Sequence, residues 1–117
     1  MENLDLKCAE LGRELAGLNG VDEKLLTDAL AVLEEQGVYA FFLYLKARGK
    51  NAGEEMSSKA REFLAATPQE RSVLGQGDSD VFSALKTLAE KLDDLLLARD
   101  LLRQALVYAR YHAKAGA

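Results

Sequence analysis

Proline, cysteine and histidine are almost absent from this sequence: each occurs once among 117 residues, and tryptophan does not occur. One proline leaves little to interrupt long helices. A lone cysteine, Cys8, cannot form an internal disulfide, so we expect a reducing cytoplasm and a small buried side chain at this position. Cys8 and His112, far apart in the sequence, are too few for a zinc site, and we expect no metal or cofactor.

Long apolar runs are missing as well. The longest such stretch, 38–45, falls far below the roughly 20 residues that a helix needs to cross a bilayer. The first five residues lack the basic start and apolar run of a secretory signal. We therefore expect no contact with a membrane.

Recognisable catalytic motifs are also absent. Residues 78–80 begin like a calcium loop, but Ser83 and Ala89 stand where that loop needs glycine and glutamate. Asp93 and Asp94 are adjacent, and adjacent helical residues point about 100° apart, so they cannot share a substrate. The sequence predicts a protein that is not an enzyme and has no small-molecule substrate, although a triad assembled only in three dimensions stays open.

What the chain does contain favours helices. Leu, Ala, Glu, Lys and Arg make up a little over half of it, hydrophobic residues make up 49%, and no stretch alternates as a strand does. The length suits one core. We predict an all-α fold, in which residues 1–117 form a single helical bundle of about five to seven helices with a long C-terminal helix.

Apolar spacing places the first helices. One stripe with steps of four and three comprises Leu4, Cys8, Leu11, Leu15 and Leu18. It predicts a helix that ends at Asn19-Gly20. Asp22 is the expected N-cap of the next helix, over about 21–36. Four of its residues are expected to face inward: Leu26, Ala29, Leu30 and Leu33.

The middle of the chain is its most apolar part. A buried strand is one interpretation of 38–48, but the length and the Lys-Ala-Arg-Gly ending favour a helix buried on most sides and capped at Gly49. We expect a loop over 50–53, followed by a helix over 54–66. One side of that helix carries Met56, Ala60, Phe63 and Leu64.

The C-terminal half contains one clear loop. Residues 67–70 resemble a capping box that starts a short helix ending at Gly75. Residues 75–80 are the expected loop, with Asp78 or Ser79 as the next N-cap. An unbroken helix from there to Ala115 would be about 54 Å long, so we predict a turn near 92–94, capped by Asp93 or Asp94.

Charge is unevenly distributed along the chain, whose net charge is -4. Residues 1–37 carry 3 basic and 9 acidic side chains, whereas residues 101–117 carry 3 basic and no acidic ones. Two basic patches result: Lys46, Arg48 and Lys50 in the middle, and Arg103, Arg110 and Lys114 near the end. These six are the candidate RNA-binding residues.

The second basic patch lies on one helical stripe, because its members are seven and four residues apart. Tyr111 and His112 lie beside it, and such a surface suits phosphate contact with stacking on unpaired bases. Two simpler interpretations stay open. Basic residues in a last turn complement the helix dipole without any ligand. Tyr108 and Tyr111 can also be core or interface rings.

Two segments resemble the small α-helical subunit of type III-B (Cmr) CRISPR effector complexes. In the first, 37–49, a glycine and an aliphatic residue open a very apolar helix. The matching residues are Gly37, Val38, Tyr44, Leu45, Ala47, Arg48 and Gly49. The second, 102–115, resembles the closing helix of that family. Tyr108, Arg110 and Ala113 fit its pattern, whereas Tyr111 and His112 stand where a basic and an aromatic residue are usual.

The resemblance covers about 25–115 and implies a function. Such a subunit stacks with copies of itself along a ribonucleoprotein, contacts neighbouring subunits and the guide–target RNA duplex, and cleaves nothing. The alternative from the residues alone is a protein-only helical adaptor or a homodimerising bundle. The stripe that begins at Leu4 could serve such an adaptor as a docking surface, but packing into the core of the chain itself is the simpler role.

Overall fold

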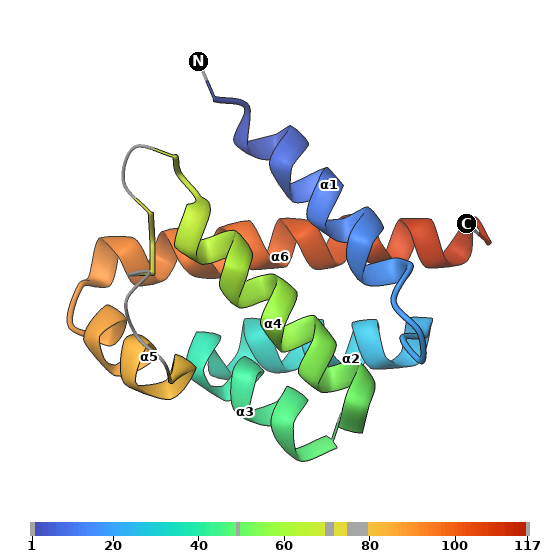
Figure 1. The fold of residues 1–117 in the computed structure, drawn as a ribbon, viewed down its shortest axis with the longest axis horizontal. Helices are drawn as coiled ribbons and strands as arrows, with labels where there is room; N and C mark the ends of the chain where they lie inside the picture. Colours follow the sequence, from blue (N-terminus) through green and yellow to red (C-terminus); the bar gives the residue numbers. More distant parts are fainter. Residues whose placement is uncertain (1, 49, 70–71, 75–79, 117) are drawn as a thin grey trace.

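The computed structural model describes residues 2–48, 50–69, 72–74 and 80–116, and these contain six helices and no strand. The helices are α1 (Leu4–Ala16), α2 (Glu23–Gln36), α3 (Val38–Arg48), α4 (Lys50–Ala66), α5 (Val81–Ala89) and α6 (Leu92–Lys114) (Figure 1). The predicted all-α bundle with a long last helix is confirmed, since α6 has 23 residues. None of the described helices is long and apolar enough to cross a membrane.

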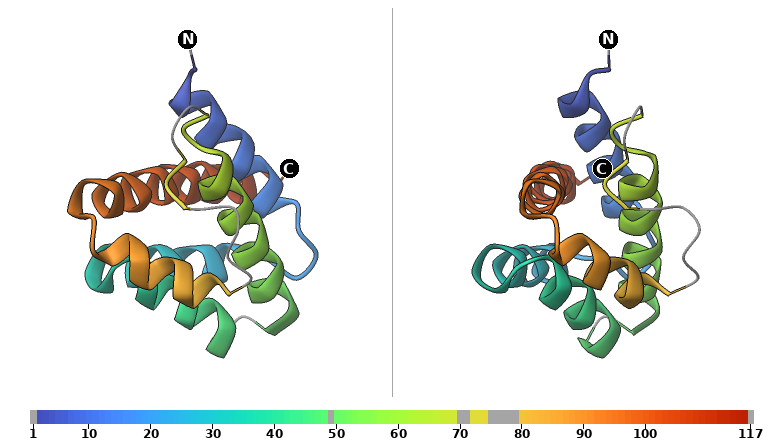
Figure 2. Two further views of the ribbon diagram at one scale, coloured as in Figure 1. Left: turned by 60° about the vertical axis from the view of Figure 1, so that its left-hand side comes forward. Right: turned by 90° about the vertical axis from the view of Figure 1, so that its left-hand side faces the viewer.

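The long helix α6 organises the bundle. It packs against α1, α2, α3 and α5, most extensively against α1. Helix α2 runs antiparallel to α6, and α4 connects the two sides of the fold by contacting both α1 and α3 (Figure 1). The view along α6 places α2 and α3 below it and α1 and α4 to its side (Figure 2). Every helix therefore has at least one face covered by a neighbour.

The apolar stripe of α1 is used in this core. Cys8, Leu11 and Leu15 are buried, and Leu4 and Leu18 pack against them at the edge. In α2 all four residues expected to face inward are buried, as are Met56, Ala60 and Leu64 of α4. The simpler interpretation of the stripe, packing into the core, is confirmed. Because the stripe is buried, little of it is left as a docking surface for a partner helix.

Local capping explains where several helices begin. The Asp22 carboxylate accepts a hydrogen bond of 2.8 Å from the backbone N–H of Leu25, as predicted for the N-cap of α2. Asn3 caps α1 in the same way, through the N–H of Leu6 at 3.0 Å. Helix α1 ends at Ala16, earlier than the predicted Asn19-Gly20. The backbone N–H of Gly17 caps this end by donating to carbonyl oxygens of the last turn, including that of Arg13.

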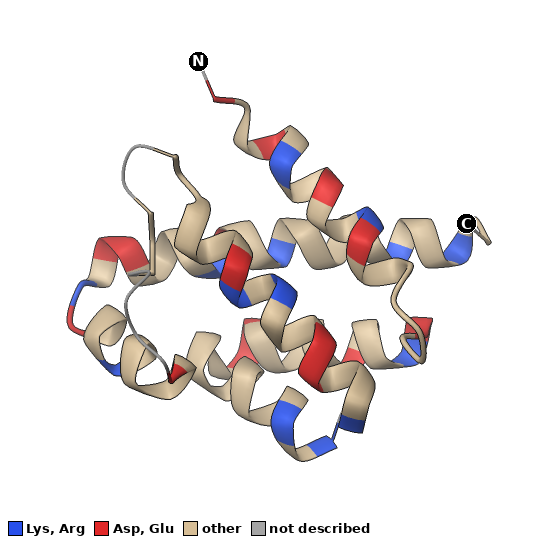
Figure 3. Cartoon of the chain, viewed as in Figure 1, with Lys and Arg blue, Asp and Glu red and all other residues tan. Residues whose placement is uncertain are grey.

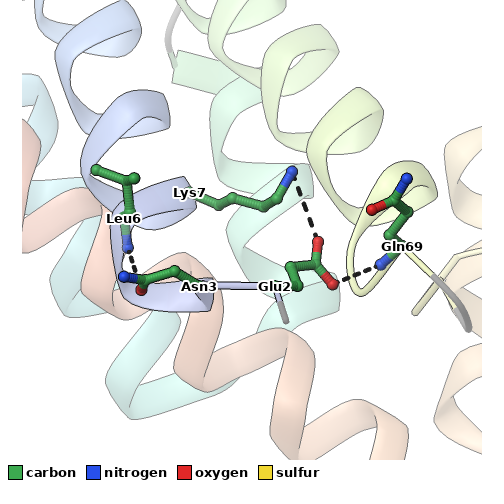
Figure 4. Close-up of polar contacts among 5 residues, drawn as sticks. All are labelled: Glu2, Asn3, Leu6, Lys7 and Gln69. Carbon is green, nitrogen blue, oxygen red and sulfur yellow. Dashed lines mark hydrogen bonds and ion pairs between the residues drawn. The ribbon is translucent and has the colours of Figure 1, made fainter.

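The segment before α1 is tied to the bend that follows α4. Glu2 accepts a hydrogen bond of 2.8 Å from the backbone N–H of Gln69, and its other carboxylate oxygen lies 3.6 Å from the Lys7 ammonium (Figure 4). A wide hollow is lined by these residues and by Pro68. The contacts join the start of the chain to residues distant in sequence, and they position the first turn of α1.

The predicted loop at 50–53 is wrong, because α4 already begins at Lys50. Lys50 has a left-handed φ of 51°, which lets the chain turn sharply from α3 into α4. Gly53 is buried, and a Cβ there would collide with the carbonyl oxygen of Leu45. This glycine therefore marks a close crossing of α3 and α4, and the loop interpretation mistook it for a turn residue. The predicted cap at Gly49 lies outside the described residues.

Two predictions for the following segment are corrected. None of the described residues of 67–74 is helical, and the N–H groups of Val73 and Leu74 donate to the backbone carbonyls of Thr67 and Leu64, so these residues do not form the predicted short helix. Glu70 and Gly75 lie outside the described residues. Asp80 is the N-cap of α5, in place of Asp78 or Ser79, which also fall outside them.

The last predicted turn exists but comes slightly earlier. Helix α5 ends at Ala89, and α6 begins at Leu92 after Glu90 and Lys91. No side chain caps α6. The two carboxylates expected to cap it, Asp93 and Asp94, lie inside its first turn, where they complement the positive end of the helix dipole.

Candidate nucleic-acid interface

The first predicted basic patch lies where α3 meets α4. Lys46 and Arg48 end α3, Lys50 begins α4, and all three are exposed. Within the described residues none of the three has a carboxylate at ion-pair distance. Helix α3 itself contains no acidic residue. The positive charge of this patch is therefore available to a ligand.

Aromatic rings accompany one of these cations, Lys46. The ammonium of Lys46 lies 5.4 Å from the ring centroid of Phe82, and the rings of Tyr39 and Phe82 are 5.3 Å apart at 56°. Tyr39 is 44% exposed and Leu43, one turn further along α3, is 49% exposed, so the prediction that α3 is buried on most sides is wrong. The aromatic–basic surface is defined here by Tyr39, Leu43, Lys46 and Phe82, and the positive charge continues at the end of α3 with Arg48 and Lys50.

The two rings of this surface were not predicted from the sequence. Tyr39 was assigned to a buried helix, because every neighbour in its run is apolar. Phe82 lies in the other half of the sequence, and only the contact between α3 and α5 brings it to Lys46. No spacing rule within one helix could have found that contact.

A hollow with mixed lining adjoins the aromatic–basic surface, between α3, α4 and the start of α5. Phe42, Val81 and Phe82 supply its apolar part, and Ser57 and Ser58 supply hydroxyl groups. Its charged lining residues are Lys46, Glu54, Arg61 and Asp80. Two cations and two carboxylates balance, so this hollow does not attract anions as the exposed end of α3 does.

The second predicted patch, on α6, is partly neutralised. Lys114 lies 3.8 Å from the carboxylate of Glu23, with both side chains still largely exposed. Arg110 is half-buried, and its Nε is buried without a hydrogen-bond partner. Arg103 is exposed and has no ion-pair partner among the described residues. Arg110 and Lys114 line a shallow hollow with Val107 and Tyr111, the latter 67% exposed.

The two patches do not join into one surface. Blue segments mark the α3–α4 junction at the lower edge of the molecule and recur along α6, with α4 and its mixed charges between them in this view (Figure 3). Acidic residues are frequent on α1 and α2, which is the origin of the charge asymmetry. The structure brings Lys46, Arg48 and Lys50 together and leaves Arg103, Arg110 and Lys114 as a separate row.

Cys8 and Tyr108, which lie outside both basic patches, make contacts between α1 and α6. Burial, followed by the nearby charge of Asp5, raises the pKa of the Cys8 thiol to about 11. The thiol donates to the carbonyl of Leu101 at 3.4 Å. The phenol of Tyr108 donates to Asp5 at 2.9 Å, and this bond raises the pKa of Tyr108. The described residues contain no group of three or more His, Cys, Asp and Glu side chains that could hold a metal ion.

Comparison with known proteins adds no relative. No protein-family model matches the chain, and no curated protein or solved structure gives a significant match.

Proposed function

We propose that this chain is a non-catalytic structural subunit of a type III-B (Cmr) CRISPR effector complex. In this role it stacks with copies of itself, contacts neighbouring subunits and binds guide or target RNA. One observation carries the proposal: Lys46, Arg48 and Lys50 are exposed together without carboxylate partners among the described residues, and the Lys46 ammonium lies over the ring of Phe82. The family resemblance rests on the segments 37–49 and 102–115, and the first of them includes this same helix end.

The first segment of the resemblance comprises helix α3 and the glycine before it. Gly37, with a φ of 100°, separates α2 from α3, and α3 runs from Val38 to Arg48 as one apolar helix that ends in cations. Phe41, Phe42 and Leu45 anchor it in the core. The cations are therefore held on a rigid element, which favours defined contacts over diffuse attraction.

The net charge of -4 does not oppose local binding. At physiological ionic strength exposed charges are screened beyond about 8 Å, so the acidic surfaces of α1 and α2 have little influence on a phosphate at the end of α3. Each phosphate that a cation neutralises releases condensed counterions, and the affinity then depends steeply on salt. A contact with about three phosphates of a single strand gives a slope of log affinity against log salt near -2.

The test is RNA binding by Arg48→Glu, measured by fluorescence anisotropy over a range of salt. We expect weaker binding and a shallower salt dependence, with unchanged thermal unfolding. Arg13→Glu is the matched control, because Arg13 is an exposed arginine of α1, outside both patches. Arg110→Glu should also weaken binding, but its half-buried guanidinium makes Arg48 the cleaner probe. Salt-independent binding, or equal loss in both Arg48→Glu and Arg13→Glu, contradicts the proposal.

A protein-only adaptor or homodimer is the second candidate. Leu92 and Leu96 favour it, because they lie one turn apart on α6 and are 64% and 39% exposed. Two leucines on one exposed face suit a contact with an apolar partner surface. Light scattering distinguishes the candidates: a stable homodimer that ignores RNA and is disrupted by Leu96→Lys favours the adaptor. A monomer that binds RNA favours the effector subunit.

A further inference from the structure

The aromatic–basic surface combines features that a purely electrostatic contact does not need. A phosphate contact requires only the cations, yet two rings from different helices stand beside them and one is well exposed. Stacking on an exposed ring is a sequence-tolerant way to hold a base. We infer that this surface binds an unpaired nucleotide, with the base stacked on Tyr39 and a flanking phosphate held by Lys46. The inference rests on the proposed function, since it names the RNA class taken by the same site.

The ring geometry decides where the base lies. The rings of Tyr39 and Phe82 are tilted by 56°, so a base cannot be sandwiched between them in parallel. Phe82 is half-buried and has the Lys46 ammonium over its ring, whereas 44% of Tyr39 is exposed. Tyr39 is therefore the stacking ring and Phe82 supports it from the side. Leu43, one turn on, extends the apolar area on the same face of α3.

Lys46 can serve the phosphate at little cost. Its contact with the Phe82 ring is a cation–π interaction at an exposed site, which is weak. The lysine side chain is long and flexible, so its ammonium can leave the ring for a phosphate beside the stacked base. Glu54 and Asp80 line the hollow on one side of Lys46 and disfavour a phosphate there.

The surface selects unpaired RNA over duplex. In a duplex the faces of the bases are covered by their neighbours, and proteins contact phosphates and 2′-hydroxyl groups. The exposed side chains of Tyr39 and Leu43 therefore add no affinity for a duplex. Tyr111 on α6 is also exposed beside cations, but Lys114 is engaged with Glu23 and Arg110 is half-buried. Tyr111 therefore provides a control ring with a similar local composition.

The experiment compares a fluorescein-labelled oligouridylate of about ten nucleotides with an abasic ribose-phosphate oligomer of equal length, on the full chain. We expect Tyr39→Leu to weaken binding of the oligouridylate about five-fold or more and to leave abasic binding unchanged. Tyr111→Leu should change neither. Phe82→Leu is a second variant that should have a smaller effect of the same sign, and circular dichroism confirms that each variant is folded.

The outcomes separate the two proposals. If the wild type binds both oligomers equally while Arg48→Glu weakens both, RNA contact stands and base stacking is overturned. A stronger effect of Tyr111→Leu than of Tyr39→Leu also overturns the inference, because it moves the stacking site to α6. If Tyr39→Leu dissolves a dimer and leaves RNA binding intact, the surface is a protein interface. If no oligomer binds, the proposed function fails as well.

Discussion

Gly12 of α1 lies directly against Tyr108 of α6: a Cβ added at position 12 would stand 2.6 Å from the Cβ of Tyr108 and 2.7 Å from the carbonyl oxygen of Ala105. Ala105 and Ala109, the small residues of α6 at this crossing, are fully buried. The most extensive helix contact of the fold therefore depends on the absence of a side chain. Tightly packed interiors transmit such small changes in volume.

Gly12→Ala should destabilise the protein. The added methyl group meets a backbone oxygen and a Cβ, neither of which can rotate away, and overpacking of this kind costs about 1–3 kcal/mol. Alanine regains up to about 1 kcal/mol through its helix propensity. We expect a net loss of about 1–2 kcal/mol, measured as a lower free energy of unfolding in urea, with the melting temperature reduced by roughly 4 °C per kcal/mol.

Gly17→Ala is the matched control for Gly12→Ala. Gly17 has a φ of -86°, which any residue adopts, and a Cβ there would lie 3.5 Å from its nearest neighbour. Alanine at this position should be neutral or stabilise by about 0.4–1 kcal/mol. If both variants destabilise equally, the close crossing of α1 and α6 is not the cause.

Cys8 should be nearly inert in the folded protein. Its side chain is buried, and a pKa raised from 9.0 to about 11 lowers the thiolate fraction about 100-fold at neutral pH, before any steric barrier. We expect reaction with Ellman's reagent to follow global unfolding and to become fast in urea. Rapid labelling of the native protein would mean that α1 separates from α6 without unfolding of the whole chain.

The pKa of Cys8 also predicts a dependence of stability on pH. Because the folded pKa is raised, the neutral thiol contributes stability that is fully present below the unfolded pKa of about 9 and is lost as pH rises toward 11. Cys8→Ala should remove this alkaline component. The measurement is the free energy of unfolding of both proteins between pH 8 and pH 11, and parallel curves would contradict the assignment.

Much of the fold follows from local rules. The steps of four and three in α1 and α2 predicted the buried residues, and Asp22 was identified as a cap because its carboxylate bonds within three residues. The errors concern interactions that are not local. Gly53 is a packing glycine because of Leu45 on another helix. The break before α6 has no side-chain cap, so the sequence offered no marker at Glu90 and Lys91.

The candidate site was predicted in part. Lys46, Arg48 and Lys50 are exposed together because the end of α3 and the start of α4 are contiguous in the chain. Phe82 could not be found, because its position depends on how α5 packs on α3. The pairing of Lys114 with Glu23 joins the last helix to the second, and a count of charges along one helix cannot reveal it.

Asp22→Ala should weaken α2. The carboxylate satisfies the Leu25 N–H and lies at the positive end of the helix, and loss of such a cap costs about 1 kcal/mol. Urea denaturation measures the change. Glu35→Ala, at an exposed position near the other end of α2, should stay within about 0.5 kcal/mol of the wild type. An equally small effect of Asp22→Ala would argue that α2 is held by its packing on α6 and α3 alone.

Tyr108→Phe should remove a contact between the first and last helices. The phenol donates to both carboxylate oxygens of Asp5 at 2.9 Å, and this bond raises the pKa of Tyr108. Because the pKa of Tyr108 is raised in the folded protein, its bond to Asp5 contributes stability that is fully present below the pKa of tyrosine in the unfolded chain, near 10. This stability is lost as pH rises through the pKa of Tyr108 in the folded protein. The variant should therefore be less stable than the wild type at neutral pH, and the difference should shrink in alkali.

Thermal unfolding of the wild type and Tyr108→Phe from pH 7 to pH 11 tests this sign. Tyr111→Phe is the control, because the Tyr111 ring is exposed on the same helix, and it should match the wild type throughout. Asp5→Asn keeps a hydrogen-bond acceptor for the phenol and removes the carboxylate charge, so it should lower the pKa of Tyr108 toward its ordinary value. A stability gap that stays constant with pH would show that ring packing, and not the bond to Asp5, is what Tyr108→Phe disturbs.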